Sequence, residues 1–323
     1  MSHNVVLKLE GLSKEFYVKG KKFPYKPKTL KAVQDIDLTV KKGETLGIVG
    51  ESGCGKSTLG RLIMRLIEPS SGEVYLNGEN MTDLKGEALR LRRKDFQMIF
   101  QDPYAAFNPR MNVQAILEEP LKTNQIPKEE WEGIIDNILE LTKIPQDARK
   151  RYPHEFSGGQ RQRISIARAI MLHPGLIVAD EPVSALDVSI QAQILNLMKE
   201  LQEKMQMSMI FISHNLASVQ YISHRVAVMY LGRIVEIADS QRLYDNPLHP
   251  YTQALIETIP IPVPGEGKKR TRITGEVPSP INLPSGCAFH LRCPYAAEEC
   301  QKIIPQMREI EKGHCVACHK YDK

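Results

Sequence analysis

The segment that most constrains the fold is the glycine-rich octet Gly-Glu-Ser-Gly-Cys-Gly-Lys-Ser, which runs from Gly50 to Ser57. An apolar run, residues 45–49, precedes it. A helical apolar pattern follows it at Leu59, Leu62, Ile63 and Leu66. The octet therefore occupies a strand-to-helix turn, where glycines let backbone amides face phosphates and the helix N-terminus adds its positive end. This context predicts a phosphate-binding loop.

Two residues of the loop have specific chemical roles. Lys56 is expected to reach the β- and γ-phosphates of a nucleotide, and the Ser57 hydroxyl is expected to ligate magnesium. The other predicted nucleotide contacts are Gly50, Ser52, Gly53, Cys54, Gly55 and Thr58. Cys54 is interpreted as a small residue of the loop. The competing interpretation is a glycine-rich turn that binds nothing, and the coincidence of Gly-Lys-Ser with the strand context disfavours it.

Two further apolar runs end in polar residues that suit phosphate chemistry. The run 176–179 ends in Asp180 and Glu181. Asp180 is expected to hold magnesium through water, and Glu181 to orient or deprotonate the attacking water. The run 209–212 leads to His214, which is predicted to contact the γ-phosphate. A single histidine is more often a structural residue, but its place after a second parallel strand favours the functional interpretation.

Taken together, these residues resemble the nucleotide-binding subunit of ATP-binding cassette (ABC) transporters. The segment Ser157-Gly158-Gly159-Gln160 matches that family's signature, with Phe156 where Leu is usual. The resemblance implies an α/β fold: a P-loop NTPase (RecA-like) core with a β-subdomain, an inserted helical subdomain and a C-terminal Cys-containing extension. It also implies a head-to-tail dimer, in which each ATP lies between the phosphate loop of one subunit and Ser157 and Gly159 of the other.

The same resemblance assigns roles to three more positions. Gln101 matches the glutamine of the Q-loop, which senses magnesium and transmits motion to the membrane domains. Asp187 belongs to a segment that matches the D-loop, which crosses the dimer interface. Phe16 falls where the family places an aromatic ring that stacks on adenine, and the adjacent Tyr17 is the alternative.

The periodicity of the chain predicts its organisation. Residues 5–245 are expected to form the ATPase domain, with a helical subdomain at about 102–163, and residues 246–323 the extension. Asn77-Gly78 predicts a hairpin turn. The signature is expected to open a helix from Arg161 to Met171. A helical apolar stripe in the subdomain is assigned to its core, at Trp131, Ile134, Ile135, Ile138, Leu139 and Leu141.

Several segments outside the ATP site resemble a narrower family, the ATPase subunits of oligopeptide and dipeptide importers, and among these the F-type subunit. They are Asn246–Thr252, the Pro-rich stretch 260–284, Phe107–Arg110 and the Lys-rich insert near residue 20. The resemblance implies a related ATPase chain as a heterodimer partner, with a second copy of this chain as the alternative. It also implies two transmembrane permease subunits and, indirectly, an extracytoplasmic solute-binding protein. The chain would be peripheral on the cytoplasmic face of the membrane. An importer of nickel or another solute is the alternative.

Composition agrees with this prediction. The 323 residues, 42% of them hydrophobic, suffice for one large domain with an appendage, and no apolar run reaches 18 residues. The N-terminus opens no signal peptide. The net charge of +5 does not argue for nucleic acid. Two other classes of protein are disfavoured. An ABC ATPase that acts on DNA or ribosomes usually carries a long coiled coil or a second cassette, and neither fits into this chain. A small-molecule P-loop kinase would need no Ser-Gly-Gly-Gln signature. The Lys-rich insert favours a solvated loop over contact with anionic lipid.

Five of the six cysteines lie in the last 37 residues, at Cys287, Cys293, Cys300, Cys315 and Cys318. Such clustering in a cytoplasmic chain argues for a metal or for coincidence, not for disulfides. Zinc usually takes paired Cys-x-x-Cys spacings, whereas four thiolates can also hold an iron–sulfur cluster. The importer resemblance implies a structural [4Fe-4S] cluster at Cys287, Cys293, Cys300 and Cys318. Cys315 as the fourth ligand, zinc, and unligated thiols are the alternatives.

Overall fold

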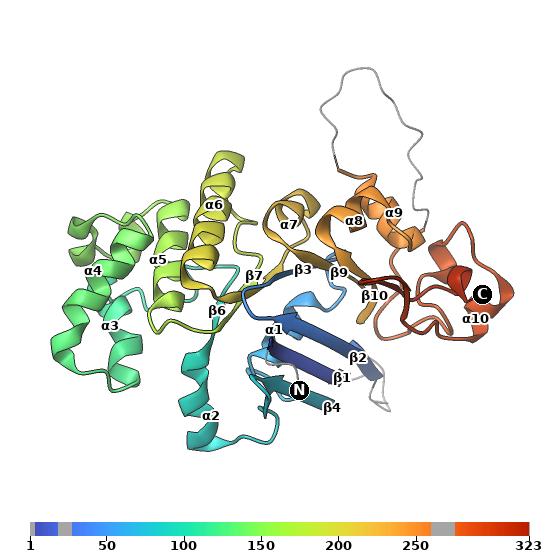
Figure 1. Cartoon of the computed structure of the whole chain (residues 1–323), viewed down its shortest axis with the longest axis horizontal. Helices are drawn as coiled ribbons and strands as arrows, with labels where there is room; N and C mark the ends of the chain where they lie inside the picture. Colours follow the sequence, from blue (N-terminus) through green and yellow to red (C-terminus); the bar gives the residue numbers. More distant parts are fainter. Residues whose placement is uncertain (1–3, 19–27, 260–274, 323) are drawn as a thin grey trace, which may run out of the picture. The chain divides into compact units, whose positions relative to one another are not determined.

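The computed structural model describes residues 4–18, 28–259 and 275–322 (Figure 1). The Lys-rich insert near residue 20 and residues 260–274 of the Pro-rich stretch lie outside the described residues. The chain divides into two compact units whose segments alternate along the sequence. The first unit comprises Met1–Leu7, Thr39–Thr45 and Tyr75–Ser213; the second comprises Lys8–Leu38, Leu46–Val74 and His214–Lys323.

The first unit contains three neighbouring strands of a sheet and five of the ten α-helices that the structure describes. Its elements in chain order are β5 (Glu79–Asn80), α2 (Gly86–Arg92), η1 (Arg93–Asp95), β6 (Phe96–Ile99), α3 (Val113–Thr123), η2 (Lys128–Glu130), α4 (Trp131–Leu141), η3 (Gln146–Lys150), η4 (Pro153–Glu155), α5 (Gly158–Ile170), β7 (Leu176–Asp180), α6 (Val188–Met205) and β8 (Ser208–Ile212). Three further strands have residues in both units: β1 (Val5–Val18), β2 (Lys28–Lys41) and β4 (Ser71–Leu76).

The strands β6, β7 and β8 are parallel neighbours. Phe96 pairs with Leu176, and Leu176 pairs with Ser208. Every residue of β7 and β8 is buried, as expected for parallel strands covered on both faces. Because parallel strands end at the same edge of a sheet, the residues that follow β6 and β7 emerge on one side. Gln101 and Glu181 are among them, and Asp180 is the last residue of β7.

Helices α3, α4 and α5 pack against one another in the first unit (Figure 1). The predicted core stripe is confirmed at its centre, since Ile135, Ile138 and Leu139 of α4 are buried. Helix α5 begins at Gly158, three residues before the predicted Arg161, because Ser157 already caps it. The predicted hairpin is also confirmed: Tyr75 pairs with Asn80 across a turn in which both central residues have positive φ.

The second unit carries the phosphate loop and the C-terminal strands. Its elements are the larger parts of β1 and β2, most of β3 (Thr45–Val49), α1 (Lys56–Ile63), α7 (Leu216–Ile222), β9 (Arg225–Tyr230), β10 (Arg233–Asp239), α8 (Ser240–Asp245), α9 (Pro250–Ile256), η5 (His290–Arg292), α10 (Glu298–Lys302), β11 (Arg308–Glu311), β12 (His314–Val316) and η6 (His319–Tyr321). Leu66, predicted to continue α1, lies beyond its end, because Arg65 has a φ of 49° and breaks the helix.

The C-terminal strands extend the sheet of the second unit. Strand β3 runs parallel to β9, and β9 is antiparallel to β10. Strand β12 then pairs with β10, placing Glu236 opposite Val316, and β11 pairs with β12. Residues after 246 therefore share backbone hydrogen bonds with the sheet that carries the phosphate loop.

A buried carboxylate organises the segment that leads into α9. The two oxygens of Glu236, which is fully buried, accept hydrogen bonds from the backbone N–H groups of Leu248 (2.7 Å) and His249 (2.8 Å). His314 of β12 lies 2.7 Å from the same carboxylate through its Nε2. The Nδ1 atom of His249 in turn accepts a hydrogen bond from the N–H of Tyr251 (3.0 Å) and caps α9. The segment thus has a defined partner for each of these polar groups.

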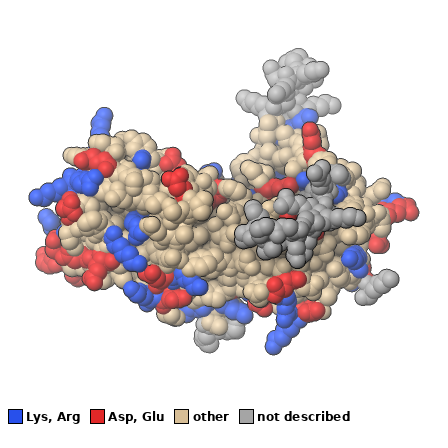
Figure 2. Space-filling view, turned by 90° about the horizontal axis from the view of Figure 1, so that it is seen from above, with Lys and Arg blue, Asp and Glu red and all other residues tan. Residues whose placement is uncertain are grey.

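Charges of both signs lie on the face shown in Figure 2, where Lys and Arg side chains lie among Asp and Glu side chains. Among the residues that the structure describes, no helix combines the length and the apolar character that a membrane span requires.

Stability should depend on the protonation of His249. Burial lowers the pKa of this imidazole from 6.5 to about 4, against a smaller opposing effect of Glu236. Between pH 6.5 and 4 the unfolded chain takes up a proton that the folded chain refuses, so the free energy of unfolding falls as the pH falls, by up to about 3 kcal/mol. Urea denaturation of the wild type and of His249→Asn, which keeps an acceptor for the cap, measures this loss. The variant should lose the pH dependence in that window, whereas His154→Asn, at an exposed histidine, should retain it.

Candidate functional site

The phosphate loop is a tight turn packed against β9. A Cβ atom at Gly50 would lie 2.1 Å from the carbonyl oxygen of Met229, so only glycine fits there. The loop is closed by a hydrogen bond from the N–H of Cys54 to the carbonyl oxygen of Glu51 (3.3 Å). Gly55 caps α1, with the N–H of Leu59 donating to its carbonyl oxygen (2.9 Å). Ser52 and Gly53 are exposed at the tip of the turn.

Lys56 lies under this turn. It is 4% exposed, and its ammonium group donates to the carbonyl oxygens of Gly50 (2.7 Å) and Glu51 (3.0 Å). The sulfur of Cys54 lies 3.8 Å from the same nitrogen, and burial raises the pKa of that thiol despite the neighbouring positive charge. The loop therefore holds a buried cation where a phosphate-binding loop needs one. Ser57 and Thr58 follow on the first turn of α1, both partly exposed.

Two residues that bind the phosphate loop, Tyr251 and Arg292, were not predicted from the sequence. The backbone N–H of Glu51 donates to the hydroxyl oxygen of Tyr251 (2.8 Å). Its carboxylate accepts two hydrogen bonds from the Arg292 guanidinium (2.8 and 2.9 Å). Tyr251 belongs to the Asn-Pro-Leu-His-Pro-Tyr-Thr segment, but Arg292 is 241 residues from Glu51 in the chain. No local pattern marks such a pair.

The acidic residues of the first unit lie as predicted at a strand end. Asp180 is 4% exposed at the end of β7. Glu181 leaves the strand with a φ of 47°, and its N–H donates to the carbonyl oxygen of Ile212 (2.9 Å). Gln101, which follows β6, donates through Nε2 to the Glu181 carboxylate (3.4 Å). The structure thus brings together the predicted Q-loop glutamine and the predicted catalytic carboxylate.

The signature forms the exposed start of α5. Ser157 and Gln160 make a capping box: the N–H of Gln160 donates to the Ser157 hydroxyl (3.4 Å), and the N–H of Ser157 donates to the Gln160 side chain (3.0 Å). Phe156, the atypical residue, is buried beneath the Arg151 guanidinium, 4.4 Å from its ring centre. A Cβ atom at Gly159 would lie 2.5 Å from Cγ2 of Ile190, so glycine permits the close approach of α5 and α6. Ser157 and Gly158 are exposed.

The remaining predicted site residues lie in both units. Asp187, in the first unit, is exposed and is the N-cap residue of α6. His214 opens the last segment of the second unit, is exposed, and follows β8 in the chain. Phe16, on β1 in the second unit, is 38% exposed, with the Lys14 ammonium 5.1 Å from its ring centre, and Tyr17 is 80% exposed. Of the predicted magnesium ligands, Asp180 and Gln101 belong to the first unit and Ser57 to the second.

Four of the C-terminal cysteines lie close enough for their charges to act on one another. Burial raises the pKa of the Cys287 thiol to about 11, and the charges of Cys300, Cys318 and Cys293 add to this shift. Burial also raises the pKa values of Cys293 and Cys318, each with Cys300 as a further cause. The carbonyl oxygen of Cys300 accepts a hydrogen bond from the N–H of Cys287 (2.8 Å).

Cys315 has different neighbours. It lies on β12, and after burial the charges that act on its thiol are those of Glu309 and Arg225. Within residues 275–322 and the rest of the described chain, no three His, Cys, Asp or Glu side chains converge as metal ligands do. All six cysteines are free thiols. The donor chemistry of the four mutually interacting thiols nevertheless fits a thiolate-bound group, since metal binding itself lowers thiol pKa values.

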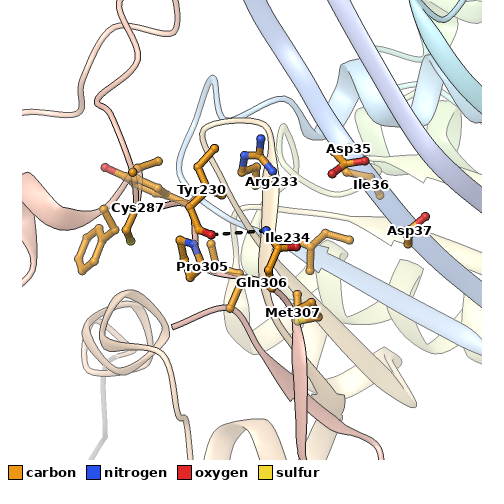
Figure 3. Close-up of a pocket in the computed structure, with 16 residues that line it drawn as sticks. Asp35, Ile36, Asp37, Tyr230, Arg233, Ile234, Cys287, Pro305, Gln306 and Met307 are labelled. Atoms are coloured by element: carbon orange, nitrogen blue, oxygen red, sulfur yellow. Dashed lines mark hydrogen bonds between the residues drawn. The ribbon is translucent and has the colours of Figure 1, made fainter. Parts of the chain in front are cut away.

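Cys287 lines a cavity of about 140 Å³ (Figure 3). Residues of β2, β9, β10 and the C-terminal segment line it, including Asp35, Asp37, Tyr230, Arg233, Cys287 and Met307. Burial raises the pKa of the Tyr230 hydroxyl; Arg292 lowers it, and the charges of Glu51 and Cys287 raise it. Tyr230 of the cavity wall therefore interacts electrostatically with Glu51 of the phosphate loop and with its partner Arg292.

Known protein families match both parts of the sequence. Residues 33–184 match the family model of ABC transporters, and residues 235–300 match that of the oligopeptide/dipeptide transporter C-terminal region. The oligopeptide transport ATP-binding protein AppF of Bacillus subtilis (strain 168) is 49% identical over 324 residues, covering 99% of this chain and 98% of that protein. The putative oligopeptide transport ATP-binding protein YkfD of the same organism is 52% identical over 300 residues, covering 92% and 91%.

Solved structures agree with the fold. The post-hydrolysis dimer of the ATP-binding cassette MJ0796 with ADP and Pi is 27% identical, with a TM-score of 0.64, and covers 72% of this chain and 98% of that one. The cbiO1 structure from Clostridium perfringens, 24% identical with a TM-score of 0.65, covers 75% and 92% and supports the fold alone. The predicted α/β P-loop fold is confirmed.

Proposed function

The chain belongs to the ATP-binding subunits of ABC transporters, and we propose that it binds and hydrolyses ATP to power the import of peptides through a membrane transporter. The observation that carries the peptide assignment is the C-terminal match: residues 235–300 match a region particular to oligopeptide and dipeptide transporters. Relatives that share nearly the whole chain are named for oligopeptide or peptide transport.

In the proposed ATP site, Lys56 neutralises the β- and γ-phosphates, and Ser57, Gln101 and Asp180 hold magnesium. Glu181 positions or deprotonates a water molecule that attacks the γ-phosphorus, so that the bond to the bridging oxygen breaks and ADP and phosphate leave. Two observations support this assignment: the buried ammonium of Lys56 within the loop, and the contact between Gln101 and Glu181. His214 would contact the γ-phosphate.

The proposed ATP site is completed by a second ATPase subunit. Ser157, Gly158, Gly159 and Gln160 would contact the γ-phosphate of an ATP held by the partner, and Asp187 would cross the interface. The exposure of Ser157 and Gly158 at a helix N-terminus supports this arrangement. So does the exposure of Val188, an apolar side chain that is 83% exposed beside Asp187. Phe16 would stack on the adenine of the ATP bound by its own loop.

The proposed assembly is that of an importer. Two transmembrane permease subunits and a second, related ATPase chain would be the direct partners, with an extracytoplasmic solute-binding protein delivering peptide. The chain would lie at the cytoplasmic face of the membrane, held there by the permease subunits. Residues 5–245 would form the ATPase domain, with a helical subdomain at about 102–163, and residues 246–323 the extension.

A [4Fe-4S] cluster bound by Cys287, Cys293, Cys300 and Cys318 is part of the proposal. The mutual electrostatic influence of these four thiols supports the ligand set, and the different surroundings of Cys315 favour Cys318 as the fourth ligand. Iron binding would stabilise these partly buried thiols as thiolates. Such a cluster would cross-link the loops of the extension.

Glu181→Gln should abolish turnover and preserve ATP binding, because it removes the carboxylate that acts on water and keeps the side-chain shape. Hydrolysis by the complex assembled with permease subunits should fall by about 100-fold or more. Lys56→Ala should instead lose ATP binding, because the phosphates lose their buried charge partner. Nucleotide titration separates these two effects.

Glu203→Gln is the matched control, since Glu203 is an exposed acid on α6. It should leave hydrolysis unchanged. Near-normal turnover by the Glu181→Gln complex would exclude Glu181 as the residue that acts on water, and retained nucleotide affinity in Lys56→Ala would contradict the role given to that ammonium.

Anaerobic purification should yield a brown protein that absorbs near 400 nm and contains about four irons per chain. Cys318→Ser should lose iron, whereas Cys315→Ser should retain it, because only the first removes a proposed ligand. Iron analysis and the absorption spectrum measure both. Colourless, iron-free wild-type protein would contradict the cluster, and loss of iron in Cys315→Ser alone would reverse the choice of the fourth ligand.

A further inference from the structure

Glu51 is the second residue of the phosphate loop. Its backbone N–H, its carbonyl oxygen and its carboxylate each have a hydrogen-bond partner. Its N–H donates to the Tyr251 hydroxyl, its carbonyl oxygen accepts from the Lys56 ammonium, and its carboxylate receives both arms of the Arg292 guanidinium. Backbone and side chain of one residue are thereby fixed by three different segments. Any change in these contacts changes the direction of the loop peptide beside Lys56.

The ion pair with Arg292 is largely withdrawn from solvent. The Arg292 side chain is 7% exposed and that of Glu51 26% exposed. Its two parallel hydrogen bonds give the pair a defined geometry, which Lys cannot reproduce. The hydrogen bonding of Arg292 to the Glu51 carboxylate is the largest cause of the raised pKa of this guanidinium. Removing one partner of such a pair leaves the other charge uncompensated.

An uncompensated carboxylate at this position would oppose nucleotide binding. Glu51 lies between Gly50 and Ser52, in the turn that is expected to surround the phosphates. A negative charge close to a polyphosphate in a partly buried site repels it. Arg292 offsets this negative charge and holds the carboxylate with two hydrogen bonds. The affinity for ATP and the geometry of the loop therefore both depend on the Arg292–Glu51 ion pair.

The guanidinium is itself positioned by aromatic side chains. Its central carbon lies 5.9 Å from the ring centres of both Tyr230 and Phe289, and Nη1 donates to the Tyr230 hydroxyl (3.3 Å). These rings pack with Tyr251: the ring centres of Tyr230 and Tyr251 are 4.7 Å apart, and those of Tyr251 and Phe289 are 5.4 Å apart. One aromatic cluster thus supports both groups that hold Glu51.

Arg292 also belongs to the segment that carries two of the cysteines. It directly precedes Cys293 and closes the 3₁₀ helix η5, where the N–H of His290 donates to the carbonyl oxygen of Cys287 (3.0 Å). The N–H of Arg292 donates to the carbonyl oxygen of Phe289 (2.9 Å). The conformation of residues 287–293 therefore sets the place of the guanidinium, and any group that orders the cysteines orders Arg292 with them.

We propose that Arg292 is a positioning residue for ATP binding, which acts through Glu51 to hold the phosphate loop and to neutralise its carboxylate, and which makes nucleotide affinity depend on the Cys-bearing segment 287–293. This rests on the proposed function in one respect, that the loop binds ATP. The C-terminal segment is then part of the nucleotide site of its own chain, in addition to any role in assembly.

The test compares ATP affinity among variants of the purified full-length chain, by titration with a fluorescent ATP analogue. Arg292→Met should weaken binding about tenfold or more. Glu51→Gln in the same chain should restore most of the loss, because the uncompensated carboxylate is gone. The ATP affinity of Arg292→Lys should be intermediate, since lysine keeps the positive charge but cannot make the two parallel hydrogen bonds of the guanidinium. Arg308→Met removes an arginine of β11 that pairs with Asp322, and this variant should bind ATP as the wild type does.

The link to the cysteine segment is tested by Cys287→Ser. It should weaken ATP binding in the wild-type background and add little in the Arg292→Met background, because both changes act through the same contact. Additive losses would contradict that link. If Arg292 were merely structural, removal of the Glu51 carboxylate would not repair its loss. Restored ATP affinity in the Arg292→Met, Glu51→Gln chain therefore distinguishes the proposed role from a structural one.

Wild-type affinity in Arg292→Met would overturn the positioning role, and so would a loss of affinity that Glu51→Gln does not restore. If Arg292→Met does not fold, Arg292→Lys with and without Glu51→Gln makes the same comparison. A wild-type chain that binds no ATP would contradict the proposed function itself, before any variant is compared.

Discussion

The interaction on which the rest of the nucleotide site depends is the contact of the Lys56 ammonium with the carbonyl oxygens of its own loop. A buried cation without an anion is costly, and the loop meets this cost with two backbone acceptors at Gly50 and Glu51. This arrangement needs the loop backbone to keep one shape. Packing of Gly50 against Met229 provides part of that constraint, and the groups that hold Glu51 provide the rest.

The C-terminal segment is joined to this loop by structure that lies far away in the sequence. Strand β12 pairs with β10, and His314 on β12 contacts the buried carboxylate of Glu236. Glu236 orders the backbone at Leu248 and His249, and the following Tyr251 accepts the hydrogen bond from Glu51. The segment that resembles peptide importers is thus continuous with the support of the phosphate loop. A change in the extension has a short physical path to the ATP site.

The sequence predicted the parts of the site that depend on local patterns. The loop was recognisable because its glycines and Lys56 stand between an apolar strand and an amphipathic helix, and the hairpin because Asn77-Gly78 suits positive φ. Gln101, which was assigned from the family resemblance, lies near Glu181 because the parallel strands that precede these two residues share an edge. Helix α5 begins earlier than predicted because Ser157 and Gln160 form a capping box. Their side chains satisfy backbone N–H groups at the helix start, so the two glycines can belong to the first turn.

Long-range pairs were beyond such patterns. The Arg292–Glu51 pair joins residues 241 apart, and neither residue type is unusual in its local sequence. The backbone strain at Glu181 was also hidden, because positive φ at a glutamate is disfavoured by about 1 kcal/mol or more and no propensity predicts it. It is imposed from outside, by the hydrogen bond from the Glu181 N–H to Ile212 on the neighbouring strand. Function here concentrates where tertiary contacts override local preference.

The central claim is that this chain supplies half of each ATP site and needs a partner subunit to complete it. The most direct measurement is the specific ATPase rate of the purified chain as a function of its concentration, with and without the second ATPase chain and the permease subunits. The account predicts a weak rate that rises with concentration and rises further when the partners are added. Full activity that is independent of concentration in the chain alone would contradict it.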